Sequence, residues 1–102
     1  AAKALRDGHV ERAILLGGSG NGEAIAANRI QGVRCCLCLT VELAKLARMH
    51  NDSNAISLGQ RIIRQDQLIE IVEAWLGTPF EGGRHIPRIE KIESLSQHSI
   101  TD

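Results

Sequence analysis

The residues of this 102-residue chain that most clearly could do chemistry form a glycine-rich segment followed by a carboxylate. Four glycines fall within six residues ahead of Glu23, and the segment reads Gly17, Gly18, Ser19, Gly20, Asn21, Gly22. Between a buried strand and a helix, such a segment lets backbone N–H groups converge on an anion. It lacks the lysine of a Walker loop and the glycine spacing of a dinucleotide-binding turn. Two interpretations stay open: an anion hole over residues 18–22, or a tight turn without a ligand.

Glu23 is expected to open the helix that follows this segment. The helix dipole favours a carboxylate there, by about 0.3–1 kcal/mol, and that effect alone explains the residue. The functional interpretation is a general base beside an anion hole. Such a pair suits proton abstraction next to a carbonyl, because the base takes the proton while backbone amides hold the enediolate oxygen. Spacing alone does not decide between the two interpretations.

Several cationic side chains could bind an anionic substrate. His50 falls at an expected helix end, where an imidazolium is stabilised and where a solvated cap is the simpler interpretation. Arg84 and Arg88 are four residues apart and share a helix face. Two guanidiniums can clamp a phosphate, although exposed charges on an amphipathic helix are the commoner reason for such a pair. Arg61 follows a strand end and is a third candidate.

The elements that must position these residues alternate along the chain. Apolar runs predict strands at 13–16, 33–39 and 55–58, and helices are expected at 1–7, 23–28, 41–49, 66–76 and 84–95. Runs without polar alternation are typical of parallel strands covered on both faces. The pattern therefore predicts one α/β domain over residues 1–102, with right-handed crossovers and a parallel sheet. Three strands leave two unpaired edges, so we expect further strands upstream or a partner that covers an edge.

Local signals refine the helices. Thr40 is the expected N-cap of the helix at 41–49, and Asp66 is a candidate cap for the helix at 66–76. The latter helix would bury Ile69, Val72 and Leu76 on one face. In the last helix, an apolar stripe recurs every three residues from position 86 to position 95.

In a parallel sheet, ligands bind at the carboxyl ends of the strands. The glycine segment, Thr40 and the turn at 59–61 all fall at those ends. The loop at 50–54 falls at the opposite end of its helix. If His50 works at the same site as the glycine segment, a second subunit supplies it more easily than the same chain does.

Composition excludes several function classes. Twelve basic and twelve acidic side chains give no net charge, and Trp75 and Phe80 are the only aromatic residues, so neither charge nor base stacking favours nucleic acid. No stretch is long and apolar enough for a membrane span, and no signal peptide is evident. Cys35, Cys36 and Cys38 lack the spacing of a metal site, and neighbours on a strand point to opposite faces. We expect three reduced thiols in a cytoplasmic protein.

Four colinear motifs resemble the ribose-5-phosphate isomerase type B family, which also includes galactose-6-phosphate isomerase subunits. They lie at 14–28, 32–34, 47–54 and 71–88. The resemblance implies a three-layer αβα Rossmann-like sheet of five parallel strands. This chain would carry three of the five, because the family begins with a strand bearing an Asp-His pair and no such segment precedes Ala1. It also implies a homodimer, possibly a tetramer, whose active sites are shared between subunits.

The family has two chemical varieties, and the residues before and after the glycine segment separate them. One variety uses as its base a cysteine at the position of Gly17. The other carries the sequence Gly-Gly-Ser-Gly-Asn-Gly-Glu and uses the glutamate, which implies Glu23 here. The resemblance further implies that Ser19 and the amides of residues 18–22 form the anion hole. His50 would assist ring opening, and substrate or phosphate would contact Asn51, Arg61, Arg84 and Arg88.

The implied reaction is the interconversion of D-ribose 5-phosphate and D-ribulose 5-phosphate through a cis-enediolate, a step of the pentose phosphate pathway. It needs no metal and no organic cofactor. Two alternatives stay open: an inactive or partner-dependent fragment that only binds a phosphosugar, and an isomerase of six-carbon phosphosugars.

Overall fold

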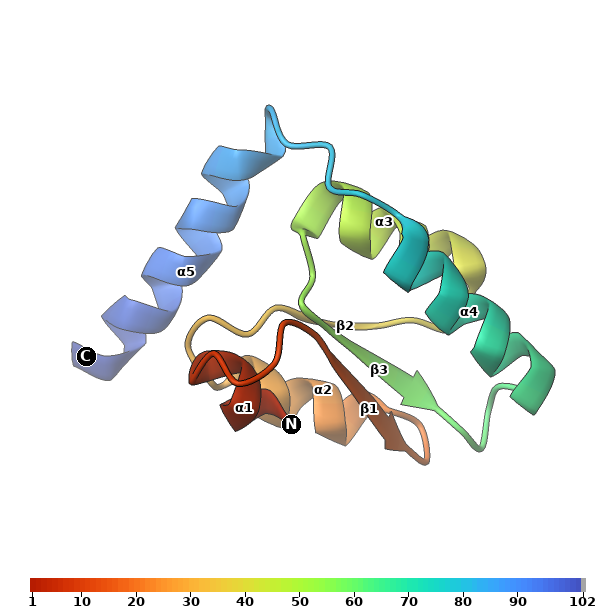
Figure 1. Ribbon diagram of the computed structural model, residues 1–102. Helices are drawn as coiled ribbons and strands as arrows, with labels where there is room; N and C mark the ends of the chain where they lie inside the picture. The colour runs from red at the N-terminus through yellow and green to blue at the C-terminus, as the bar shows by residue number, and fades with distance from the viewer. Residues whose placement is uncertain (102) are drawn as a thin grey trace.

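A three-stranded parallel sheet forms the centre of the chain (Figure 1). The computed structural model describes residues 1–101, with side chains as far as residue 95. Strand β3 (Ala55–Gly59) is fully buried and lies between β1 (Ala13–Gly17) and β2 (Cys35–Leu37). The register pairs Ala13 with Ala55 and Gly17 with Gly59. Strands β1 and β3 therefore end side by side.

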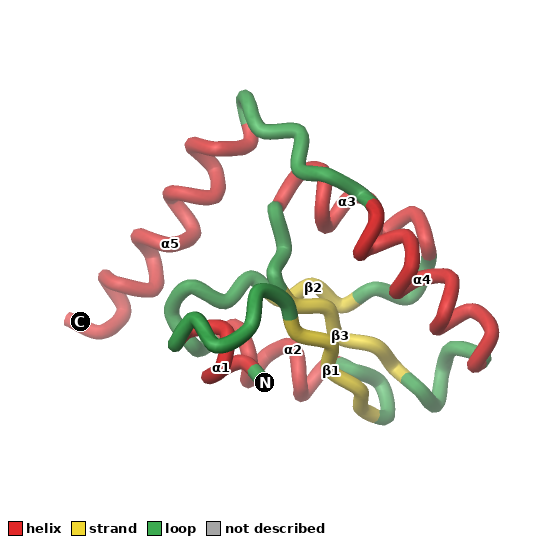
Figure 2. The backbone as a smooth tube through the Cα atoms, viewed as in Figure 1, coloured by secondary structure: helices red, strands yellow, loops and turns green. Residues whose placement is uncertain are grey.

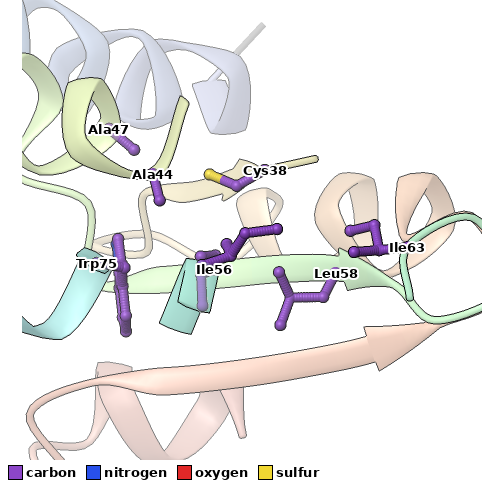
Figure 3. Packing of buried hydrophobic residues seen from close by; sticks show 8 residues of the cluster. Cys38, Ala44, Ala47, Ile56, Leu58, Ile63 and Trp75 are labelled. Atoms are coloured by element: carbon purple, nitrogen blue, oxygen red, sulfur yellow. The ribbon is translucent and has the colours of Figure 1, made fainter. Parts of the chain in front are cut away.

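Helices cover both faces of the sheet, as predicted. On one face, α1 (Ala2–Arg6) and α2 (Asn21–Asn28) enclose a small core of aliphatic and thiol side chains: Ala13, Ala27, Val33, Cys35 and Ala55. On the other, α3 (Val41–Asn51) and α4 (Gln65–Gly77) close over a larger core, shown in Figure 3: Cys38, Ala44, Ala47, Ile56, Leu58, Ile63, Ile71 and Trp75. The three-layer αβα architecture is confirmed.

Helix α4 differs from its prediction at both its start and its buried face. The helix begins at Gln65 after Arg64, and Asp66 lies inside its first turn and accepts the N–H of Gln67 instead of capping the helix. Ile69 and Leu76 are about half exposed, whereas Ile71 and Trp75 are buried with Leu68 and Val72 packed beside them. Two overlapping sets of apolar residues recur at helical spacing in α4. The set that includes Trp75 is the one that is buried.

The other local signals agree with the structure. Thr40 caps α3, since its Oγ1 accepts the N–H of Leu43 at 3.1 Å. Cys35 belongs to the smaller core while Cys38 belongs to the larger one, so these thiols lie on opposite faces of the sheet, and all three cysteines are free. No helix among the described residues is long and apolar enough to cross a membrane.

Helix α5 (His85–Thr101) projects away from the sheet and its covering helices (Figures 1 and 2). Its apolar stripe is exposed: Ile86 and Ile92 are 46% exposed and Leu95 is 66% exposed. An ion pair between Arg34 and Glu93, at 2.6 Å, links the helix to the body of the chain.

Candidate active site

The glycine segment lies against the carboxyl end of β3, which holds its carbonyl groups. The amides of Gln60 and Arg61 donate to the carbonyls of Gly17 and Gly18, at 2.8 and 3.0 Å. The buried Ser57 hydroxyl donates to the carbonyl of Gly20 at 2.6 Å. In a trans peptide, the C=O and the next N–H point in opposite directions. The N–H groups that follow these carbonyls therefore point away from β3.

Apart from that of Asn21, which donates to the Ser19 hydroxyl at 3.3 Å, the amides of residues 18–22 are free to bind a ligand. Within residues 1–101, the N–H groups of Gly18, Ser19, Gly20 and Gly22 donate to no protein acceptor. Helix α2 begins at Asn21, so the positive end of its dipole adds to the same place. Free amides at a helix N-terminus form a site for an anion or a developing oxyanion.

Glycine is required where this loop meets β3. Gly20 has a φ of 86°, and a Cβ on it would lie 2.7 Å from the Leu37 side chain. A Cβ on Gly59 would lie 2.5 Å from the carbonyl oxygen of Ser19. The loop therefore approaches the strand end too closely for any side chain at either position.

The Glu23 carboxylate lies directly over Gly17. A Cβ on Gly17 would lie 2.5 Å from Oε1 of Glu23 and closer still to Oε2. The exposed carboxylate of α2 thus fills the space that a side chain at position 17 would occupy. A potential base and a set of free amide donors stand together at the carboxyl end of β1.

Arg61 brings positive charge to the same place. Its Cδ and Cζ lie 3.4 and 3.7 Å from the position that a Cβ on Gly18 would take. The guanidinium is near the free amides and is exposed to solvent. We call residues 18–22 with Glu23 and Arg61 the glycine-loop group.

The other predicted residues lie at the end of α3, which leads into β3, and at the start of α5, away from the carboxyl end of β1 (Figure 1). His50 and Asn51 are in the last turn of α3, half-exposed and exposed respectively. The His50 ring stacks on that of His85, with centroids 4.5 Å apart and planes inclined by 21°. Arg84 and Arg88 flank His85 and are exposed. The prediction that His50 is remote from the glycine segment of its own chain is confirmed.

Sequence reasoning missed two residues in this second group. Glu81 places its Oε1 3.7 Å from Nε2 of His50 and 3.6 Å from Nε2 of His85. His85 is 5% exposed although it is a polar side chain. Glu81 and His85 are four residues apart, a spacing that could have paired them, whereas His50 is 31 positions from Glu81 and meets it only through the fold. We call His50, Asn51, Glu81, Arg84, His85 and Arg88 the histidine group.

The ligand atoms of His50, Glu81 and His85 all lie within 4.8 Å of one another, which is close enough to suggest a metal site. Ring geometry argues against it. A metal ion binds an imidazole nitrogen in the plane of the ring. Two stacked planes inclined by 21° intersect far from either ring, so one ion cannot lie in both planes. The observed arrangement is a carboxylate facing two stacked imidazoles.

A cleft of about 650 Å³ opens between α5 and the connection from α2 to β2. Of the predicted site residues it contains only Asn51. Cys35 in β2 and Cys38 directly after it are also unsuited to chemistry. Burial raises the pKa of the Cys35 thiol to about 11, and that of Cys38 to about 12, so both remain protonated at neutral pH.

Comparison with known proteins agrees with this arrangement. The model of a family described as Ribose/Galactose Isomerase matches residues 1–92. Ribose-5-phosphate isomerase B of Escherichia coli strain K12 is 42% identical over 96 residues, which are 94% of this chain and 64% of that protein. D-erythrulose-4-phosphate isomerase of Pectobacterium atrosepticum is 43% identical over 91 residues, 89% of this chain and 60% of that protein.

The structure of Clostridium thermocellum ribose-5-phosphate isomerase B superimposes on the chain with a TM-score of 0.95 at 38% identity, covering 96% of this chain and 66% of that one. The chain thus spans about two thirds of the length of the relatives it matches. Sequence identity, matched length and superposition agree, and the chain belongs to the ribose/galactose isomerase family.

Proposed function

We propose that this chain is the isomerase of an aldose phosphate, with D-ribose 5-phosphate and D-ribulose 5-phosphate as its substrate pair. The observation that carries the proposal is the Glu23 carboxylate over Gly17, beside four amides that have no protein acceptor. A base and oxyanion donors that face the same small volume are what an enediolate reaction needs. The names of the relatives, which cover isomerases of five-carbon and four-carbon phosphosugars, agree with this chemistry.

The proposed reaction is a proton transfer between two neighbouring carbons. Once the sugar ring is open, Glu23 takes the proton from C2 and the electron pair of that bond forms the C1–C2 double bond. The aldehyde oxygen becomes an oxyanion and accepts hydrogen bonds from the loop amides. The Ser19 hydroxyl already accepts the N–H of Asn21 at 3.3 Å, which leaves its own hydrogen free to donate. The proton of the C2 hydroxyl passes to O1, and O2 becomes the carbonyl oxygen as Glu23 returns its proton to C1, which gives the ketose.

A complete site requires residues from both groups, and we propose that two copies of the chain supply them. The glycine-loop group lies at the carboxyl end of β1, and the histidine group lies away from it, at the end of α3 and the start of α5 (Figure 1). The exposed apolar stripe of α5, next to Arg84 and Arg88, provides a surface that a second copy could bury. In the resulting homodimer, His50 of one subunit opens the ring and Glu23 of the other takes the proton. The guanidinium groups of Arg61, Arg84 and Arg88 hold the phosphate.

The cysteines are free, which fits a cytoplasmic enzyme, and the proposed reaction belongs to the pentose phosphate pathway.

Loss of the base tests this proposal. Glu23→Gln should lower the rate of ribose 5-phosphate conversion about 10²- to 10⁴-fold and leave substrate binding in place. Glu70→Gln is the matched control, because Glu70 is an exposed glutamate of α4 outside both groups. Conversion can be followed as ribulose 5-phosphate formation, and binding as amide shifts in the loop. A Gln variant that retains the wild-type rate would place the base elsewhere.

A mixing experiment tests the shared site. Glu23→Gln and His50→Ala are each expected to be inactive, but a heterodimer would place both mutations in one site and leave the other intact. Mixed proteins should therefore regain activity as subunits exchange, which mass spectrometry can follow. Proven exchange without recovery would contradict the shared site.

A second candidate function is phosphosugar binding without turnover. Ile14 and Leu16 of β1 are 44% and 55% exposed, which would fit a sheet that needs a further covering element before it is active. In that case the loop amides and arginines would bind ribose 5-phosphate, and wild-type protein would show no conversion. A six-carbon aldose phosphate in the same assay separates the two isomerase alternatives.

A further inference from the structure

The connection between α4 and α5 returns to the end of α3 and is fixed there by its backbone. The N–H of Glu81 donates to the carbonyl of Met49 at 3.1 Å. Met49 precedes His50 in the last turn of α3, where carbonyls lack helical partners. Glu81 therefore stands beside His50 independently of its own side chain.

The side chain of Glu81 then faces both imidazoles. Its Oε1 lies at ion-pair distance from Nε2 of His50 and from Nε2 of His85, at 3.7 and 3.6 Å. The turn at Gly82 and Gly83, both with positive φ, brings His85 back over Glu81. His85 is buried and stacks on the half-exposed ring of His50. A rigid ring on one side and a carboxylate at its edge thus hold the His50 imidazole.

We propose that Glu81 is a positioning residue for His50, an inference that rests on the proposed function. A carboxylate facing Nε2 favours the tautomer with the proton on that nitrogen, as the orienting carboxylate does in histidine-based catalytic sites. Nδ1 of His50 is then the unprotonated nitrogen, which is the one able to accept a proton from the substrate. Glu81 and His85 are the titratable groups that contact His50 among the described residues.

This arrangement also connects phosphate binding to ring opening. Arg84 precedes His85 and Arg88 follows it one turn later on α5. A phosphate held by these arginines is attached to the same turn that orients His50. The sugar would therefore be bound and its ring opened by one rigid unit.

Ring opening and proton exchange at C1 can be measured separately. Opening of the ribofuranose ring takes the proton of the C1 hydroxyl, breaks the bond from C1 to the ring oxygen and protonates that oxygen. D-Ribulose 5-phosphate cannot close a five-membered ring, because its O5 carries the phosphate. Exchange of its C1 proton with D2O therefore needs the base and the amides but no ring opening. Glu81→Gln should slow the first process and spare the second.

We would compare wild type, Glu81→Gln, Glu81→Asp and the control Glu70→Gln. The expected kcat for ribose 5-phosphate falls about 10- to 100-fold in the Gln variant, the order of loss that a misplaced catalytic group causes. Deuterium exchange into ribulose 5-phosphate should stay within about twofold of wild type by the same reasoning, and Asp should recover part of the loss. Equal losses in both reactions would overturn the inference, since they would indicate a general defect.

A measurement without turnover separates this inference from the proposed function. Nitrogen-15 spectra of histidine report the protonated ring nitrogen directly. Wild type should show the proton of His50 on Nε2, and Glu81→Gln should show a mixture of tautomers. The same tautomer in both proteins would overturn the inference whether or not the chain is active. A wild-type chain with the expected tautomer but no conversion would contradict only the proposed function.

Discussion

Gly17→Ala is the substitution whose effect follows most directly from the structure. The added methyl group would lie 2.5 Å from Oε1 of Glu23 and nearer to Oε2, well inside van der Waals contact. Because Gly17 does not have a positive φ, the backbone accepts alanine without strain. The flexible end of Glu23 must move instead, by about 1 Å or more to reach ordinary contact distance. Displacement of a reacting group by that much costs about 10²-fold in rate.

We therefore expect Gly17→Ala to lower kcat about 100-fold, with the melting temperature unchanged or slightly raised. Gly77→Ala is the matched control, because a Cβ there meets nothing within 4 Å. The rate would be measured as ribulose 5-phosphate formation and the fold by thermal unfolding. The double variant Gly17→Ala/Glu23→Gln should be no slower than Glu23→Gln alone, since the methyl group acts only through the carboxylate. A Gly17→Ala protein with a rate within twofold of wild type would refute the reasoning.

Two further predictions concern stability. Burial raises the pKa of Cys35 to about 11 and that of Cys38 to about 12, from the ordinary 9.0. Above pH 9.0 the unfolded chain therefore loses thiol protons that the folded chain keeps. The free energy of unfolding should fall as the pH rises from 9.0 to about 12. Urea unfolding across this pH range should show that the free energy of unfolding falls less steeply in the double variant Cys35→Ala/Cys38→Ala than in wild type. Trp75→Phe removes a buried indole that donates to Ser53 at 2.7 Å and should cost about 1–3 kcal/mol. Adding Ser53→Ala should recover part of that loss, because the two residues share this hydrogen bond. If the costs of the two substitutions simply add, the result would contradict a hydrogen bond between Trp75 and Ser53.

Features set by neighbours in sequence were predictable. Thr40 caps α3 because its hydroxyl has only to reach the third residue of the same helix. The glycine segment was placed at the carboxyl end of a strand by the apolar run before it and the alanines after it. Both signals act over a few residues, so no knowledge of the fold was needed to see them.

Features set by packing were not predictable from pattern. In α4, Ile69 and Ile71 both belong to plausible helical stripes, and the sheet beneath the helix determines which one is buried. Spacing could not show that the Glu23 side chain reaches back over Gly17, because that depends on where α2 begins relative to β1. Its start at Asn21, two residues earlier than predicted, brings the carboxylate to that position.

The separation of the two groups follows from the topology of the sheet. In a parallel sheet each crossover helix runs antiparallel to the strands. The end of α3 must therefore lie toward the amino ends of the strands, opposite the carboxyl end of β1. His50 cannot approach Glu23 of the same chain unless this fold is broken. A reaction that needs both residues therefore depends on assembly. An isolated chain could hold an anion on its loop amides or orient a histidine through Glu81, but with the roles proposed for His50 and Glu23 it would not combine ring opening and proton transfer at one site.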